Sequence, residues 1–469
     1  MKTGMLLEKL INVAQATKTD FAFSMNMTPS GLSKILTGKR LPFLKEKRMF
    51  SRQAAAYFAE ALYGHNCYLK FDQIFPVLYN FNSQYELEMF LAYALEYALG
   101  RDFAVENNEA LDYPDKEIGF LGKKTILNMF CVIVSDYIIS NHDVPLEMYS
   151  TLPIFSRFYA DIFRRIIMVN PEKQKYISFN HFVDISAFEA SYDEYNIDVL
   201  LSIAQAQQYC NLNLWKIKEE IRSSFLLLKG EFLLLFNIQI EGTPLMTFIT
   251  HKGYLTVFFN SLMKKDAKKI SYNRSEAIAV LEEDSSFIDR LIDRHIDAVY
   301  SFIPIGYLIE EKDLDGMLDQ ETIKKAMLKL FNSIMTKETV FCVTVDAMMS
   351  FGATGKAIIP LIGVIDIPSD RRITYLQRFN SYMDEDKPGK IKILNCDLPK
   401  VVVLCLRGLS IVYLMDSEYT FEKIHFFETD MINNILGSEV TDGNMKTMEF
   451  SLDLCNTYMD ELSRRLEWD

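Results

Sequence analysis

The cysteines of this chain are few and widely spaced, which argues against disulfide frameworks and structural zinc sites. The 469 residues include seven cysteines, an odd number, and no Cys-x-x-Cys pair occurs. A disulfide framework and a structural zinc site are therefore not expected. We expect instead reduced, mostly buried thiols in a cytoplasmic protein. The cysteines are Cys67, Cys131, Cys210, Cys342, Cys396, Cys405 and Cys455.

Long apolar runs are also missing. The two most apolar stretches are residues 225–240 and 357–367, and the first is interrupted by Lys229 and Glu231. A membrane-spanning helix needs about 20 apolar residues. The polar, periodic N-terminus does not resemble a secretory signal. We therefore expect no membrane partner.

Patterns that carry catalysis or metal binding are scarce. None of the six histidines stands in His-x-x-x-His or His-Glu-x-x-His spacing. Asp293, His295 and Asp297 alternate on an expected helix, so they cannot converge on one metal ion. Residues 352–356 (GATGK) space their glycines too closely for a phosphate loop, and Ala357 stands where Ser or Thr would bind magnesium. We predict no catalytic residue, metal or cofactor, although an active site built from distant residues stays open.

A net positive charge is found at only one end of the chain. Residues 1–52 contain ten Lys and Arg against three Asp and Glu, a net charge of +7, whereas residues 53–469 contain 40 against 60, a net charge of −20. A basic head on an acidic body fits a module that meets phosphates, attached to a body that phosphates repel. Charge alone would equally fit a solvated loop at residues 39–52.

Residues 18–42, KTDFAFSMNMTPSGLSKILTGKRLP, predict two short helices joined by a tight turn. Phe21 and Ala22 face inward, and Ala22 is small enough to let another helix come close. Asn26 stands where the chain must reverse, and asparagine tolerates the left-handed conformation. Thr28 fits the N-cap of the second helix, and Pro29 fits its first position.

The second of these helices keeps one face free. Leu32, Ile35 and Leu36 fall at helical spacing and form its buried stripe. Gly38 is a natural helix stop. The free face and the basic segment that follows carry Thr28, Ser30, Ser33, Lys34, Lys39 and Arg40.

This pattern resembles the lambda-repressor-like family of helix-turn-helix domains, also called the Cro-repressor or xenobiotic-response-element type, over about residues 5–62. The family has a small residue in the first helix, a turn residue four positions later, and apolar residues at set distances beyond it. Those places hold Ala22, Asn26, Met27, Leu32 and Ile35. A closing Gly-basic-basic-x-Pro segment stands at residues 38–42. Two positions depart from the pattern: Lys18 replaces a common Gln, and Gly31 weakens its helix by about 1 kcal/mol relative to Ala.

The resemblance implies that the second helix enters the major groove of double-stranded DNA. It implies that Ser30, Ser33 and Lys34 face base edges, with Pro29 beside them against a thymine methyl. It also implies that phosphates are held by Thr28, Lys39 and Arg40. Two half-sites multiply affinity and specificity, so a homodimer is expected.

The rest of the chain indicates a multidomain protein, mainly α with a C-terminal α+β region. We expect a helix-turn-helix domain at 1–62, a helical linker or dimerisation domain at 63–228, and an α+β sensor domain at 229–469 with an antiparallel or mixed sheet and helices. Helices are expected at 85–99, 125–139, 152–169, 198–209, 215–228, 275–283, 286–300, 320–335 and 445–466. Strands are expected at 232–240, 245–250, 254–259, 340–345, 357–367, 390–394 and 401–414.

A loose internal echo links residues 232–259 with residues 401–427. Both run through apolar strands and a turn to an aromatic pair, Phe258-Phe259 and Phe426-Phe427, before a helix. Two copies of one α/β unit would explain the echo, and chance in a Phe-rich chain would explain it equally well.

These observations favour a sequence-specific DNA-binding transcriptional regulator, with no enzymatic activity, whose C-terminal region senses an effector. The effector is an unknown small molecule, peptide or protein. Two alternatives stay open: a scaffold or defence-type interaction protein, and an enzyme with a DNA-binding targeting head. The operator sequence and the sense of regulation are beyond what the sequence indicates.

Overall fold

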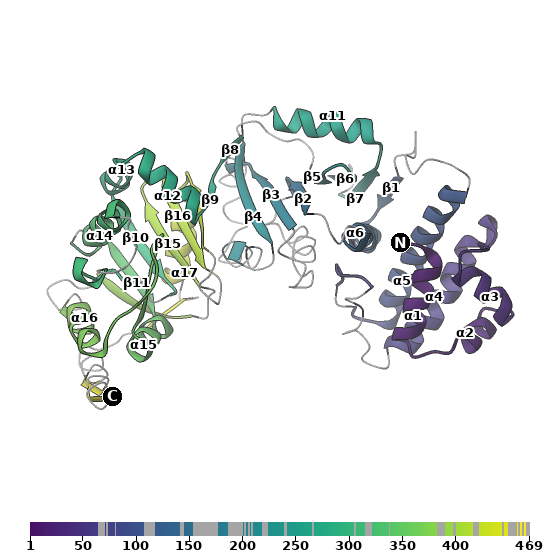
Figure 1. Cartoon of the computed structure of the whole chain (residues 1–469), viewed down its shortest axis with the longest axis horizontal. Coiled ribbons are helices and arrows are strands. Elements are labelled where there is room, and N and C mark those ends of the chain that lie inside the picture. Colours follow the sequence, from purple (N-terminus) through teal and green to yellow (C-terminus); the bar gives the residue numbers. More distant parts are fainter. Residues whose placement is uncertain are drawn as a thin grey trace. The chain divides into compact units, whose positions relative to one another are not determined.

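A computed structural model of the chain forms two compact units (Figure 1). Unit 1 comprises residues 1–182, 209–212 and 217–267, and unit 2 comprises residues 183–208, 213–216 and 268–469. No helix in the described part of the chain is long and apolar enough to cross a membrane. The structure describes residues 1–63, 71, 74–79, 81–106, 118–140, 145–152, 177–185, 200, 203–204, 207, 210–217, 224–238, 242–264, 267–303, 306–314, 321–336, 338–381, 390–396, 400–415, 422–442, 445–448, 457, 460–461 and 464–465.

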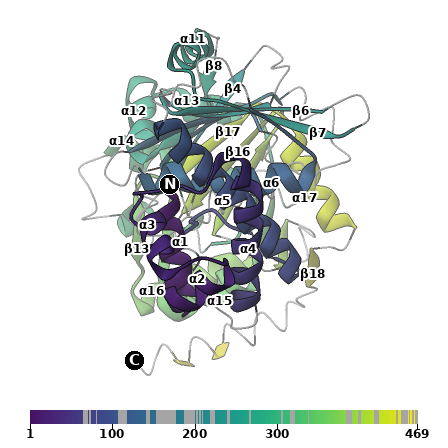
Figure 2. The ribbon, with the colours of Figure 1, turned by 90° about the vertical axis from the view of Figure 1, so that its right-hand side faces the viewer.

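Unit 1 begins with a helical head. The head contains α1 (Thr3–Val13), α2 (Lys18–Ser24), α3 (Pro29–Leu36), the 3-10 helix η1 (Leu44–Glu46) and α4 (Lys47–Tyr63). The long α5 (Gln84–Glu106) packs along α4. Apolar side chains from four of the head's helices meet in its core, among them Leu6, Phe21, Leu32 and Phe58, all at most 1% exposed. Figure 2 looks onto this group of helices.

An eight-stranded sheet follows the head. Its strands are β1 (Ile118–Leu121), β2 (Leu146–Ser150), β3 (Ile177–Val183), β4 (Asn211–Ile217), β5 (Ser224–Leu228), β6 (Phe232–Ile238), β7 (Pro244–Ile249) and β8 (Ala267–Lys269). Their order is β1-β7-β6-β5-β2-β3-β4-β8. β2 and β3 pair in parallel, whereas β5, β6, β7 and β1 form an antiparallel series. Among the described residues, α6 (Lys123–Ser140) follows β1 and α11 (Lys252–Met263) follows β7.

Unit 2 contains a second eight-stranded sheet, ordered β18-β14-β11-β10-β15-β16-β17-β9. Its strands are β9 (Ser271–Asn273), β10 (Ile296–Ser301), β11 (Val340–Thr344), β14 (Ile391–Asn395), β15 (Val401–Leu406), β16 (Leu409–Met415), β17 (Glu422–Phe427) and β18 (Lys446–Met448). A separate hairpin pairs β12 (Lys356–Ile359) with β13 (Gly363–Asp366). The described helices of unit 2 are α12 (Arg274–Glu283), α13 (Phe287–Asp293), η4 (Glu311–Asp313), α14 (Glu321–Thr336), α15 (Val345–Thr354), α16 (Ser369–Ser381) and α17 (Met431–Thr441).

The two sheets have the same topology. The second order, read from β9, is β9-β17-β16-β15-β10-β11-β14-β18. It matches the first order, β1-β7-β6-β5-β2-β3-β4-β8, strand by strand. The strand directions agree as well, since β10 and β11 are parallel like β2 and β3, and both hairpin series are antiparallel. α17 follows β17 as α11 follows β7. The chain therefore contains two copies of one α/β unit.

This topology confirms the internal echo but corrects its alignment. β5, β6 and β7 correspond to β15, β16 and β17, so the first copy of the echo starts at residue 224. The aromatic pairs do not correspond, because Phe258 and Phe259 lie in helix α11, whereas Phe426 and Phe427 lie in strand β17. Residues 254–259, which were expected to form a strand, lie within helix α11.

The prediction of a helical stretch over 63–228 is wrong where β1 to β5 lie. The helices expected at 85–99 and 125–139 are present as α5 and α6, but residues 215–228 contain the end of β4 and all of β5. Residues 286–300 divide into α13 and β10, and 446–448 form β18. Strands β3 and β5 are buried in nearly every position, and the sequence of β5 lacks the alternation that marks a half-exposed strand. Residues 153–169 and most of 198–209 lie outside the described residues.

The strands expected at 357–367 and 401–414 are each two strands joined in a hairpin, β12-β13 and β15-β16. Residues 352–354 lie at the end of α15, and Gly355 ends it with φ +69°. Asp293, His295 and Asp297 do not share a helix, because α13 ends at Asp293 and β10 begins at Ile296. The described cysteines are free thiols, and all of them except Cys396 are buried.

Candidate nucleic-acid interface

The turn between α2 and α3 has the backbone geometry that its sequence predicts. Thr17 caps α2, where its Oγ1 accepts the N–H of Asp20 at 3.0 Å. Asn26 adopts the left-handed conformation with φ +52°. The N–H of Met27 then donates to the carbonyl of Ala22 at 2.9 Å. These bonds end α2 and set the direction in which α3 starts.

α3 is capped at its N-terminus by Thr28. The Oγ1 of Thr28 accepts the N–H of Gly31 at 3.1 Å, and Pro29 occupies the first helical position. A Cβ added at Gly31 would lie 3.2 Å from that same oxygen. Glycine therefore leaves room for the cap, which gives a physical reason for a residue that weakens the helix.

Gly38 ends α3 in the left-handed conformation, with φ +68°. The N–H of Gly38 donates to the carbonyl of Ile35 at 3.0 Å, and the N–H of Lys39 donates to the carbonyl of Lys34 at 2.8 Å. This pair of bonds is the Schellman arrangement. It holds the backbone of Lys39 and Arg40 against the last turn of the helix.

All seven residues that the resemblance assigns to DNA lie between residues 28 and 40, on α3 and at its two ends. Each of their side chains is exposed, while Leu32 and Ile35 behind them are 1% exposed and Leu36 is half-buried. The side-chain ammonium groups of Lys34 and Lys39 have no hydrogen-bond or ion-pair partner among the described residues. The seven are Thr28, Pro29, Ser30, Ser33, Lys34, Lys39 and Arg40.

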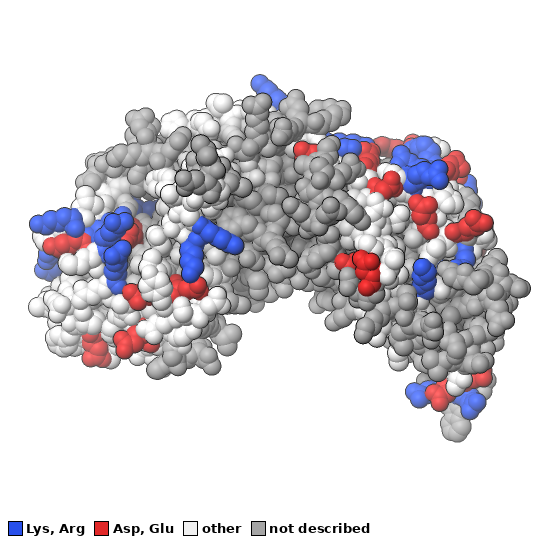
Figure 3. Space-filling view, turned by 180° about the vertical axis from the view of Figure 1, so that it is seen from behind, with Lys and Arg blue, Asp and Glu red and all other residues white. Residues whose placement is uncertain are grey.

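Arg40 is positioned by an aromatic side chain that the sequence did not single out. Its guanidinium lies 5.7 Å from the ring centroid of Phe43, whose side chain is 57% exposed. An exposed cation over an aromatic face gains about 0.5–1 kcal/mol. The contact orders a side chain that would otherwise be free in solvent. Figure 3 shows Lys and Arg side chains interspersed with Asp and Glu side chains on one face of the molecule.

α1 supports α3 through a contact between backbones. A Cβ added at Gly4 would lie 2.2 Å from the carbonyl oxygen of Leu36 and 2.9 Å from that of Ile35. Only glycine lets the two helices approach this closely, because the opposing atoms are backbone and cannot rotate away. A single glycine in an unaligned sequence carries no signal of such a role.

A buried serine and histidine lie together in unit 2. The Oγ of Ser271 lies 2.6 Å from Nδ1 of His425, and it accepts the N–H of Leu214 at 2.7 Å. Which of these two atoms donates depends on the tautomer of the histidine ring. Both side chains are fully buried on paired strands, so the pair fixes strand register and does not face solvent.

Burial lowers the pKa of His181 and of His425 to about 3, from an ordinary value of 6.5. A histidine that stays neutral when folded but protonates when unfolded contributes stability that is complete above pH 6.5 and is lost as the pH falls towards 3. For each of these histidines, we expect the free energy of unfolding of the part of the chain around it to fall by about 1.4 kcal/mol for every pH step of one below 6.5. Urea unfolding at pH 7.5, 6.5 and 5.5 measures this slope.

In His425→Gln, the slope of unit 2 should flatten. Equal slopes in the parent chain and in His425→Gln would contradict the assignment.

Comparisons with known proteins give little. No family model matches the chain, and no curated protein matches it. Among solved structures, it is similar to the archaeal chromatin protein TrmBL2, whose structure is described as showing a novel mode of DNA binding. The identity is 12% and the TM-score is 0.21, over 38% of this chain and 63% of that one. The matched part spans less than two thirds of TrmBL2, and a likeness this low carries no argument.

Proposed function

We propose that this protein is a sequence-specific DNA-binding transcriptional regulator and that α3 is its recognition helix. The observation that carries the proposal is the open face of α3. Its exposed polar side chains and the unpartnered Lys34 lie directly beside Lys39 and Arg40, which the Schellman bonds hold at the end of the helix. Exposed hydroxyls and cations on a capped helix are the groups that read bases and hold phosphates.

The remaining parts of the proposal follow from this role. One head offers few contacts, so we propose a homodimer that binds two half-sites of double-stranded DNA. The two α/β copies form the effector-sensing region, and the protein acts by binding, with no chemistry of its own. The lambda-repressor-like assignment of the head rests on the spacing from Ala22 to Ile35 and on the cap geometry at Thr28 and Gly38.

Lys39→Ala with Arg40→Ala should weaken binding to every DNA sequence alike. Each phosphate contact contributes about 0.9 to the slope of log K against log salt, so losing both should reduce that slope by about 2. Fluorescence anisotropy with a labelled duplex between 50 and 200 mM salt measures it. Lys325→Ala with Arg407→Ala is the matched control, since both are exposed cations of unit 2. An unchanged slope in the head variant would remove Lys39 and Arg40 from the interface.

Ser30→Ala and Lys34→Ala should relax preference at particular base pairs, because these side chains face the bases in the proposed complex. A good base contact contributes about 1–3 kcal/mol of discrimination. Selection from a random duplex pool with each variant and with the parent compares the recovered sites. The same site from parent and variant would show that the substituted residue does not read bases.

A further inference from the structure

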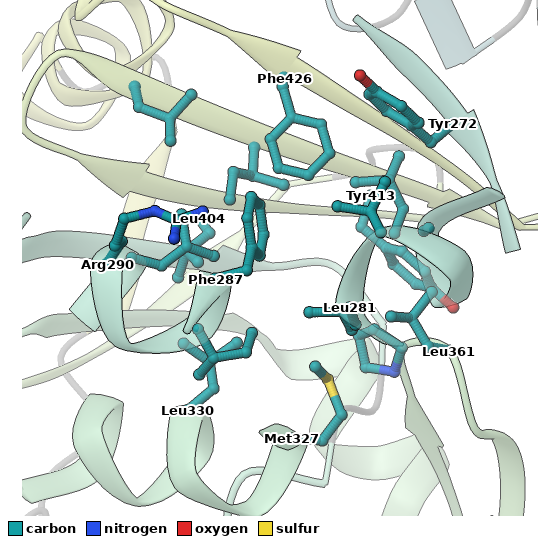
Figure 4. A pocket seen from close by; sticks show the side chains of 18 of the residues that line it. Tyr272, Leu281, Phe287, Arg290, Met327, Leu330, Leu361, Leu404, Tyr413 and Phe426 are labelled. Carbon is teal, nitrogen blue, oxygen red and sulfur yellow. The ribbon is translucent and has the colours of Figure 1, made fainter. Parts of the chain in front are cut away.

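Unit 2 contains a partly open cavity of about 370 Å³ between its sheet and the helices that cover it (Figure 4). The sheet side comes from β15, β16 and β17, and the helical side comes from α12, α13 and α14. Pro360 and Leu361 of the β12-β13 hairpin close one end. A cavity of this size and build is typical of small-molecule sites.

The lining of the cavity is predominantly apolar. Aliphatic and aromatic side chains make up most of it, among them Leu281, Leu330, Leu404 and Ile411. Three aromatic rings meet edge to face at one wall: the ring of Phe426 lies 5.5 Å from that of Tyr272 and 5.9 Å from that of Phe287. Such a lining favours an apolar ligand body.

The end of the cavity at Leu361 is held by a buried polar cluster. Glu422 accepts the N–H of Leu361 at 3.1 Å, and Arg274 donates to the carbonyls of Leu361 and Ile362 at 3.1 and 2.6 Å. Burial raises the pKa of Glu422. Leu361 itself is held at φ +67°, a conformation that a leucine adopts only under constraint. The wall is therefore built in place before any ligand arrives.

The charged side chains around the cavity are mostly cationic. Lys268, Lys269, Arg290 and Arg294 stand against one acid, Glu428, in a chain whose net charge is −13. Arg290 pairs with Asp284, Lys268 with Glu428 and Lys269 with Glu276. Arg294 is exposed and has no side-chain partner in the described part of the chain.

We propose that this cavity binds a small amphiphilic carboxylate, with its apolar body among the leucines and aromatic rings and its carboxylate at Arg294. The body replaces water against an apolar lining, and the head adds an ion pair at the rim. This cavity would be the effector site of the proposed regulator, so its role in regulation rests on the proposed function. The binding site itself is independent of DNA.

Calorimetric titration of the full chain with three probes of equal length tests the ligand class. We expect decanoate to bind at least tenfold more tightly than decylammonium, with 1-decanol between them, because only the head group differs. Equal or tighter binding of the ammonium would overturn the proposal.

Two variants locate the binding site. Val280→Trp places a large side chain into the cavity from the half-buried face of α12 and should abolish binding of decanoate and decanol alike. Arg294→Ala should weaken decanoate about two- to fivefold and leave decanol unchanged, as an exposed ion pair allows. Arg407→Ala, an exposed arginine that does not line the cavity, is the matched control. Unchanged decanoate binding in Val280→Trp would place the ligand elsewhere and overturn the proposal.

The same samples separate this proposal from the proposed function. No decanoate binding, in a chain that still selects a DNA site, would overturn the cavity proposal alone. Decanoate binding in a chain that selects no DNA site would uphold the cavity and remove the regulatory role.

Discussion

Replacing Asp136 with alanine is expected to destabilise unit 1 by about 3–5 kcal/mol, the usual cost of removing one partner from a buried ion pair. Asp136 lies on α6 with a side chain that is 1% exposed, and it pairs with the amino group of Met1 and with the guanidinium of Arg101. The hydroxyl of Tyr97 also donates to it at 3.0 Å. Its removal would leave two cations without their partner.

This cluster ties the head to the α/β part of unit 1. The amino group comes from the start of α1, Arg101 and Tyr97 come from α5, and Asp136 comes from α6. Next to it, Asp102 accepts the N–H of Thr3 at 2.8 Å. Burial lowers the pKa of the Met1 amino group, and Asp136 opposes that shift. The unfolding of unit 1 should therefore become less cooperative in the variant.

Urea unfolding followed by circular dichroism measures the effect. Asp289→Ala is the matched control, since Asp289 pairs with Lys329 at the surface and its side chain is 49% exposed. An exposed pair contributes about 0–1 kcal/mol, so the control should change stability little. Similar losses in Asp136→Ala and Asp289→Ala would show that the buried cluster is not what holds these helices together.

Gly4→Ala is expected to displace α3 and to lower DNA affinity at least tenfold. The new Cβ would overlap the carbonyl oxygens of Ile35 and Leu36, so α1 and the end of α3 must move apart. Overpacking of this kind costs about 1–3 kcal/mol, occasionally more, and backbone atoms put it at the upper end. The movement would also shift Lys39 and Arg40, because their backbone N–H groups bond to the last turn of α3.

Gly437→Ala is the control for this substitution. Gly437 lies inside α17, and an added Cβ there meets nothing within 4 Å. Alanine should stabilise that helix by about 0.5–1 kcal/mol. Thermal melting and DNA anisotropy of both variants compare them. A Gly4→Ala chain that melts and binds like the parent would contradict the close packing of α1 on α3.

The head could be predicted from sequence because its signals are local. Thr28, Asn26 and Gly38 each act on the backbone within a few residues, and the structure places each in the expected conformation. Leu32 and Ile35 are buried as their spacing predicts. The assignment of base and phosphate contacts stays a prediction, since exposure of a side chain does not show what it touches.

The α/β copies were harder to predict because their strands are buried on both faces. Residues 224–228 (SFLLL) form a short apolar run without alternation, and a run of this kind does not distinguish a strand from a buried helix. Residues 254–259, rich in aromatic and β-branched side chains, form part of α11. That helix begins where Nδ1 of His251 accepts the N–H of Tyr254 at 3.1 Å, a cap that no strand propensity reveals.

The duplication and the cavity depend on contacts between distant residues. The two copies share a strand order, which cannot be read from any short stretch of sequence. The sequence comparison therefore aligned the wrong aromatic pairs. Arg294 and Phe426 are far apart in the chain and line one cavity. In the sequence, its apolar lining residues are indistinguishable from ordinary core residues.

Selection from a random duplex pool with the full-length protein at moderate salt tests the central proposal most directly. The proposal predicts an inverted repeat whose half-sites lie about one helical turn of DNA apart, as two recognition helices of a homodimer require. Recovery of no motif, with only salt-sensitive background binding, would contradict it.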